Sequence, residues 1–179
     1  MMKNKLLVAI VAFLMLGSAA IAQTTMKIGY ADVDYILGQM PESKQVESEL
    51  QAHNTQLQNQ LQAKYQEYQQ KLQAYQQGAA TMVDAVKNEK ETELAQLEQR
   101  IQKFQQDAQA SMQKKQTTLM EPLYTKVGNN IEAVAKEHGY THILNGQVGG
   151  IDVVLYADEQ YDISDLVLQK MGITPAPSK

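Results

Sequence analysis

The chain has 179 residues, with 16 basic and 20 acidic side chains, a formal net charge of −4 and no cysteine. The acidic balance argues against general electrostatic attraction to nucleic acid or anionic lipid. The absence of cysteine excludes disulfide bonds and thiol chemistry. Stability must therefore come from packing or from oligomerisation.

The N-terminus has the three parts of a secretory signal peptide. Lys3 and Lys5 form a positive segment, and residues 6–16 form an uninterrupted apolar run. This run is shorter than the roughly 20 residues that span a bilayer, although an uncleaved N-terminal anchor is the alternative interpretation. Cleavage after residue 22 would remove both lysines and take the formal charge from −4 to −6. The residues that define the cleavage site are Ala20, Ala22 and Gln23.

The segment after the signal peptide predicts a short strand and then the start of a helix. Ile28 and Tyr30 alternate as in a strand. Asp32 or Asp34 suits the cap of a following helical turn. The same pair could bind a cation if both carboxylates lay on one strand face, but capping is the favoured interpretation. Pro41 suits the first position of the next helix.

Two long helical stretches follow, at 43–77 and 82–119, and Gly78 separates them. Their apolar residues recur at steps of three, four and seven, which is close to a heptad. We predict an antiparallel helical hairpin with its tip near 78–86 and arms about 50 Å long, at a rise of about 1.5 Å per residue. The high glutamine content is also typical of disordered tracts, but the regular apolar stripe favours helices.

The C-terminal part mixes helix and strand. Pro122 lies within a continuing helical pattern, so we expect a bend near 120–124. Residues 141–145 and 151–156 are short apolar runs joined by a glycine-rich segment, and they predict a β-hairpin. Residues 162–165 (DISD) resemble a capping box that opens a last helix.

These elements predict an α+β fold, mainly α, in which a long antiparallel coiled-coil helical hairpin projects from a small β-containing oligomerisation body. Residues 43–118 would form the arm, 26–42 with 119–173 the discontinuous body, and 174–179 a tail. A body of roughly 70 residues has a marginal core for one chain. We therefore expect a homo-oligomer whose shared body includes Ile28, Tyr30, Ile143, Leu144, Val154 and Leu155.

The sequence carries no pattern that predicts catalysis. Its three histidines, His53, His138 and His142, do not form an H-E-x-x-H arrangement. The glycine-rich segment at 146–150 lacks the Lys-Ser/Thr of a phosphate loop. No G-x-S-x-G motif or evident nucleophile–base pair is present. We expect no enzyme activity, no catalytic or metal site, and no cofactor.

The remaining candidates for function are apolar side chains on the arms and at the tip. Methionine and tyrosine make adaptable contacts that suit varied partners. The helical spacing of the tyrosines favours packing between the arms, whereas for the tip residues packing and partner contact are balanced. The candidate contact residues are Tyr65, Tyr68, Tyr75, Met82, Val83 and Val86.

The order of several short motifs around the central hairpin resembles the Skp/OmpH family of periplasmic chaperones. The resemblance implies a homotrimer whose arms surround a cavity and hold unfolded outer-membrane β-barrel proteins in the periplasm without ATP. Separately from the resemblance, the acidic charge leads us to expect no nucleic-acid partner, and the short apolar run no stable membrane insertion. The motifs are 27–32 (KIGYAD), 35–37 (YIL), 131–136 (IEAVAK), 143–145 (ILN), 155–158 (LYAD) and 162–168 (DISDLVL).

The charge departs from the family pattern, because the best-known members are strongly basic and this chain is acidic. Electrostatic capture of clients and binding of lipopolysaccharide are therefore not carried over. A structural coiled coil that spaces components of the cell envelope is the alternative function.

Overall fold

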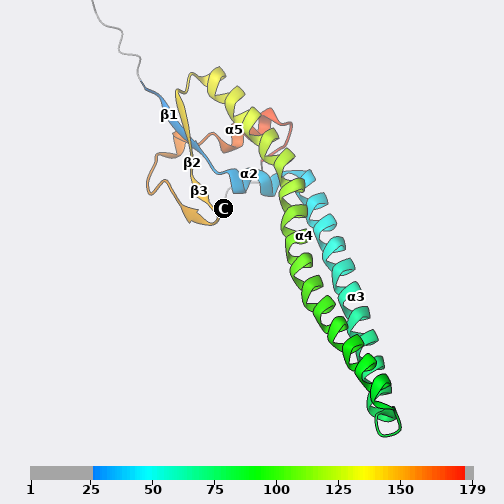
Figure 1. Cartoon of the computed structure of the whole chain (residues 1–179). Helices are drawn as coiled ribbons and strands as arrows, with labels where there is room; N and C mark the ends of the chain where they lie inside the picture. The colour runs from blue at the N-terminus through cyan, green and yellow to red at the C-terminus, as the bar shows by residue number, and fades with distance from the viewer. Residues whose placement is uncertain (1–25, 176–179) are drawn as a thin grey trace, which may run out of the picture.

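The computed structural model describes residues 26–175 (Figure 1). The predicted signal peptide, with Ala20, Ala22 and Gln23, lies outside these residues, as do 176–179 of the predicted tail. Two long helices, α3 (Pro41–Gly78) and α4 (Asp84–His138), project as a hairpin from a small body that contains the strands. The predicted fold class, α+β and mainly α, is confirmed.

The body begins with strand β1 (Ile28–Ala31) and helix α2 (Val33–Gln39). Asp32 caps α2, and its Oδ1 accepts a hydrogen bond of 2.9 Å from the Tyr35 backbone N–H. Asp34 lies exposed in the first turn of α2 and not in the strand. The two carboxylates therefore do not share a strand face, which removes the basis for the cation-binding alternative.

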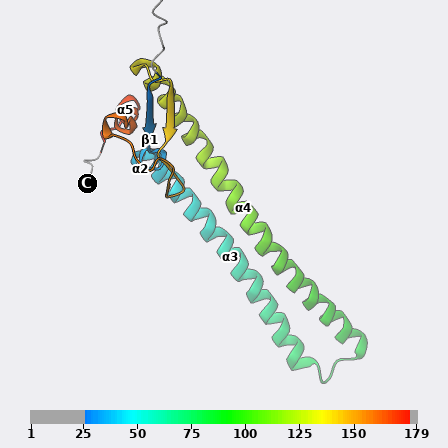
Figure 2. The same cartoon turned by 90° about the vertical axis from the view of Figure 1, so that its left-hand side faces the viewer.

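The arm is a pair of helices that lie side by side from the body to the tip (Figures 1 and 2). Helix α3 begins with Pro41, as predicted, because a proline needs no hydrogen-bond partner at the first helical position. The contact between the arms buries Val46 of α3 together with Leu97 and Ile101 of α4. Residues 79–83 connect the helices at the tip.

Helix α4 continues from the arm into the body and runs unbroken through Pro122. We expected a bend at 120–124, and the helix is continuous across these residues. Gly139, with φ 69°, ends α4 in the left-handed conformation that favours glycine. The Nζ of Lys27 donates a hydrogen bond of 2.8 Å to the backbone carbonyl of His138 and so satisfies one of the last carbonyls of the helix.

The strands pair differently from the sequence prediction. Strand β2 (His142–Asn145) pairs in parallel with β1, with Gly29 opposite Ile143. Strands β3 (Gln147–Val148) and β4 (Ile151–Asp152) form a separate antiparallel pair. The predicted hairpin between 141–145 and 151–156 is therefore wrong.

Two glycines explain the position of the hairpin that does form. Gly149 and Gly150 have φ values of 61° and 78° and connect β3 to β4. A tight two-residue hairpin turn of this kind requires positive φ at both central positions. The turn thus lies inside the glycine-rich segment, while β2 pairs with a strand that is more than a hundred residues away in the chain.

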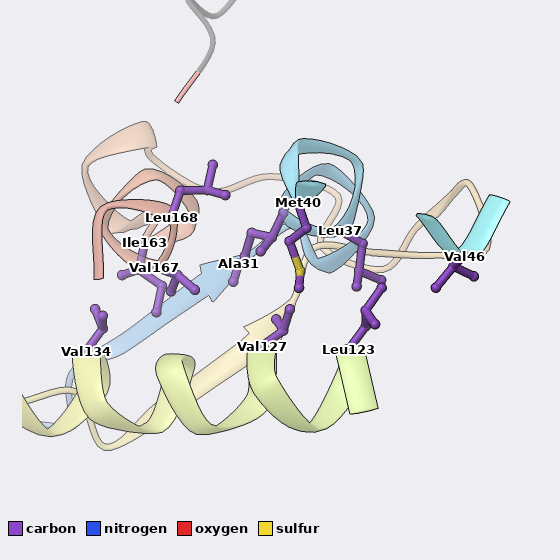
Figure 3. Close-up of a cluster of buried hydrophobic side chains, with 11 residues drawn as sticks. Ala31, Leu37, Met40, Val46, Leu123, Val127, Val134, Ile163, Val167 and Leu168 are labelled. Carbon is purple, nitrogen blue, oxygen red and sulfur yellow. The ribbon is translucent and has the colours of Figure 1, made fainter. Parts of the chain in front are cut away.

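The core of the body joins both ends of the chain. Helix α5 (Ser164–Lys170) follows the short helix η2 (Glu159–Tyr161). Together with α2 it packs against the part of α4 that carries Leu123, Val127 and Val134 (Figure 3). The buried cluster consists of Ala31, Ile36, Leu37, Met40, Val46, Leu123, Val127, Val134, Ile163, Val167 and Leu168.

The start of α5 is held by a network that differs from the predicted capping box. Asp162 Oδ1 accepts a hydrogen bond of 2.8 Å from the Ser164 backbone N–H, and Asp165 accepts one of 3.1 Å from the hydroxyl of Tyr35. The buried Ser164 hydroxyl in turn accepts a 2.8 Å bond from the backbone N–H of Asp32. The predicted capping box does not form, because the Asp165 carboxylate accepts its hydrogen bond from Tyr35 of α2.

Candidate interaction surfaces

The described part of the chain contains no group of three or more His, Cys, Asp or Glu side chains that could hold a metal ion. Two histidines do meet a hydroxyl. His142 Nδ1 lies 3.1 Å from Oγ1 of the adjacent Thr141, and His53 Nε2 of α3 lies 2.9 Å from Ser111 Oγ of α4. Sequence reasoning missed this pair because 58 positions separate the two residues. Within residues 26–175 no carboxylate hydrogen-bonds to this ring, so the third group that orients a catalytic base is lacking. The pair joins the two arms.

Two of the three candidate tyrosines of α3 form hydrogen bonds to α4. Gln105 Nε2 donates a 2.9 Å hydrogen bond to the Tyr65 hydroxyl, and the Tyr75 hydroxyl donates to Glu91. The hydrogen bond to the Glu91 carboxylate raises the pKa of Tyr75, because it favours the protonated phenol. Tyr68 is half-buried. Tyr65, although bonded across the arm, keeps 42% of its surface exposed.

The tip presents valine more openly than methionine. The Met82 side chain folds back onto Gly78, so closely that its Cε lies 2.5 Å from the position a Cβ would take there. Val83 is 67% exposed and Val86 is 38% exposed. The two valines are thus the more accessible of the three tip residues singled out from the sequence.

The strand residues predicted to build an oligomer lie on two different faces of the β1–β2 sheet. Ile143 packs against the buried core of its own chain. Ile28 and Leu144 lie on the opposite face and are 44% and 49% exposed. Tyr30 is half-buried. Only the outward face is therefore available to another molecule.

A second apolar surface of the body surrounds the β3–β4 hairpin and the segment after it. The predicted residue Leu155 is 92% exposed, whereas Val154 is half-buried. Exposed apolar groups gathered in one segment of a protein indicate an interaction site. Sequence reasoning treated residues 151–156 as a paired strand and missed most of this surface. We call it the body patch: Val148, Ile151, Val153, Leu155 and Tyr156.

The half of the arm nearer the body carries a groove that the sequence did not reveal. Two hollows of about 640 and 350 Å³ lie between α3 and α4 and share Asn54 and Met112. They extend from Ser43 near the body to Leu61 in the middle of α3. We call this continuous surface the arm groove. Its apolar side chains include Val46, Leu50, Leu57, Leu61, Phe104, Ala108, Met112 and Met120.

Ion pairs join the two arms outside the groove. Lys115 Nζ lies 3.1 Å from Glu49 Oε2, and Lys126 pairs with Glu42 nearer the body. The hydrogen bonds from these lysines lower the pKa of both glutamates. Because these side chains are substantially exposed, each pair contributes modestly to stability and chiefly fixes the lateral register of the arms.

The comparisons with known proteins agree with this architecture. The family model described as outer membrane protein (OmpH-like) matches residues 27–171, and the chain belongs to this family. Among solved structures, a candidate OmpH-like outer membrane chaperone from Caulobacter crescentus CB15 has the same fold, with a TM-score of 0.70 at 15% sequence identity. The match covers 86% of this chain and 89% of that one. A search of curated proteins found no match.

Proposed function

We propose that the protein is an ATP-independent holdase chaperone of the periplasm. It binds unfolded outer-membrane β-barrel proteins and prevents their aggregation. The observation that carries the proposal is the long two-helix arm of an OmpH-like chain, which projects from the body with apolar and amide side chains at its surface. Such an arm offers a large contact area while the body keeps its own core.

The mode of capture follows from the charge of the chain. The net charge is negative, and lysines on the arm such as Lys71 and Lys115 are paired with glutamates. The proposed mechanism therefore does not rely on attraction of the client by positive charge. Many weak apolar and amide contacts hold the client, and their number gives the affinity. Val83 and Val86 at the tip, with Tyr65 on the arm, are proposed as client contacts because they are exposed.

We further propose that three copies assemble through their bodies. The outward face of the β1–β2 sheet, with Ile28 and Leu144, and the body patch together give each copy an apolar surface that its own chain leaves uncovered. A trimer would place three arms around one client, which raises the effective concentration of binding sites. The stoichiometry is taken from the family resemblance.

Export is part of the proposal. Cleavage of the N-terminal signal after Ala22 would release a mature protein that begins at Gln23. No helix among residues 26–175 is long and apolar enough to cross a bilayer. N-terminal sequencing of the protein from a periplasmic extract should read Gln-Thr-Thr-Met. An intact Met1 in that fraction would contradict cleavage.

A pull-down tests the holdase against the alternative of an envelope scaffold. Affinity-tagged protein, crosslinked in cells and recovered from the periplasm, should bring down many different outer-membrane β-barrel proteins. A scaffold would instead recover one stable partner in constant ratio. Val83→Ser should reduce the yield of β-barrel proteins without changing the melting temperature, because Val83 is largely exposed. Recovery of a single partner by both forms would contradict the holdase.

A further inference from the structure

The arm groove differs in chemistry from the rest of the arm. The larger of its two hollows, which we call the central hollow, lies between Asn54 and Leu61 of α3. It is lined by apolar side chains and by amides, with no charged residue among them. Among the described residues that line the two hollows, Glu47 is the one charged side chain. Glu47 lines the end near the body, and Lys64 lies toward the tip, with its ammonium 5.2 Å from the centre of the Phe104 ring. The groove thus suits a segment whose middle is uncharged.

The interhelical ion pairs leave the groove open. Glu49 and His53 bind Lys115 and Ser111 across the arm, but none of these four side chains lines the groove. Apart from Val46, which is buried, the apolar residues of the groove stay partly exposed. Leu57 remains only half-buried in the arm. The free chain therefore keeps apolar surface in contact with water along one side of its arm.

The amides at the groove favour an extended peptide over a helix as the occupant. Each amide side chain offers both a hydrogen-bond donor and an acceptor. An extended segment has free backbone N–H and C=O groups, whereas a helix satisfies these groups internally. The amides that line the central hollow are Asn54, Gln58, Gln105 and Gln109. Their positions on both helices allow them to bond a backbone that lies between α3 and α4.

The groove is long enough for most of one strand of a membrane β-barrel. From Ser43 to Leu61 the groove follows α3 for about 27 Å, at about 1.5 Å per residue. An extended chain rises about 3.3 Å per residue, so about eight residues fit. Transmembrane β-strands have about 9–11 residues, with apolar side chains at alternate positions. One face of such a strand would contact the apolar residues while its backbone edges meet the amides.

We propose that the arm groove binds one extended, centrally uncharged strand of an unfolded outer-membrane β-barrel protein. This inference rests on the proposed holdase function and specifies where and in what form the arm holds its client. Each arm then takes up one strand at a time, and alternation of apolar residues in the client, more than total hydrophobicity, determines binding.

A tryptophan reporter can test the groove directly, because the chain contains no tryptophan. Phe104→Trp introduces an indole into the groove, and Tyr161→Trp introduces one into the body as a control. The probe is an acetylated ten-residue peptide in which leucine alternates with threonine. The matched peptide has the same composition, with all leucines together. We expect a saturable blue shift of emission for Phe104→Trp with the alternating peptide, and none for Tyr161→Trp.

A matched pair of alanines tests the contact surface. Ala108 lines the groove, while Ala110 is exposed two positions away and does not line it. In the Phe104→Trp background, Ala108→Gln should weaken binding of the alternating peptide at least about tenfold, because a polar side chain fills the apolar floor. Ala110→Gln should leave the affinity unchanged. Equal binding of the two peptides, or equal effects of the two alanine substitutions, would overturn the inference.

Two further measurements separate the possible failures. If wild-type protein suppresses aggregation of an unfolded β-barrel protein but Phe104→Trp shows no response to the peptide, the groove is overturned and the holdase stands. If wild-type protein does not suppress aggregation, the holdase fails and the client role of the groove fails with it. If Ala108→Gln changes the oligomeric state in sedimentation, the groove is occupied by a second copy, which also overturns the inference.

Discussion

Leu155→Asp should separate assembly of the bodies from folding of the single chain. The Leu155 side chain is 92% exposed in one chain, so its replacement removes almost no contact within that chain. Burial of a leucine side chain at an interface contributes about 1.5–3 kcal/mol. A loss of about 2 kcal/mol per interface corresponds to a dissociation constant raised roughly 30-fold. The buried carboxylate adds a further desolvation cost, because it has no designed partner.

Sedimentation velocity across the micromolar range measures this effect. Wild-type protein should sediment as an oligomer and Leu155→Asp as a smaller species, while far-UV circular dichroism stays the same. Val83→Asp is the matched control, because Val83 is 67% exposed at the tip and lies far from the body along the arm. An unchanged sedimentation coefficient for Leu155→Asp would refute assembly through the body patch, and so would an equal change for the control.

Three further substitutions test the fold itself, each at a fixed protein concentration. Leu168→Ala should lower the free energy of unfolding by about 2–5 kcal/mol in urea titrations, because Leu168 is fully buried; a change below about 1 kcal/mol would contradict its place in the core. Gly29→Ala should destabilise by about 1–3 kcal/mol in the same assay, because its Cβ would lie 2.8 Å from a ring carbon of Tyr140; an unaffected variant would show that the ring moves freely. The hydrogen bond and charge of Lys126 lower the pKa of Glu42, so their contribution to stability is present above the ordinary glutamate pKa and is lost as the pH falls through the lowered value. Lys126→Gln should therefore reduce the melting temperature at neutral pH, and its difference from wild type should shrink as the pH falls below the ordinary glutamate pKa; a difference that does not change with pH would contradict this pairing.

The arm was predictable because its signals are local. The heptad-like spacing predicted the two helices, Pro41 predicted the start of α3, and Gly78 predicted the turn between the helices. The strand pairing was not predictable by the same means, because β1 and β2 meet only after the whole hairpin has returned to the body. A parallel pair needs a long crossover connection, here the arm itself, and no local motif in the sequence marks it.

The surfaces were less predictable than the helices for a related reason. Exposure of Leu155, and of the other residues of the body patch, depends on which elements cover residues 148–156, and the alternation of a short apolar run does not reveal this. The arm groove depends on how far α3 and α4 are rotated about their axes. Gln58 and Gln109 lie on different helices, and only the packing of α3 against α4 brings them to one hollow.

Light scattering during dilution of a urea-unfolded outer-membrane β-barrel protein tests the central claim most directly. The mature protein, in several-fold molar excess and without ATP, should suppress the rise in scattering and keep the client in soluble complexes. A rise in scattering as large as that with an equal mass of an inert protein would contradict the account of the arms as a holdase.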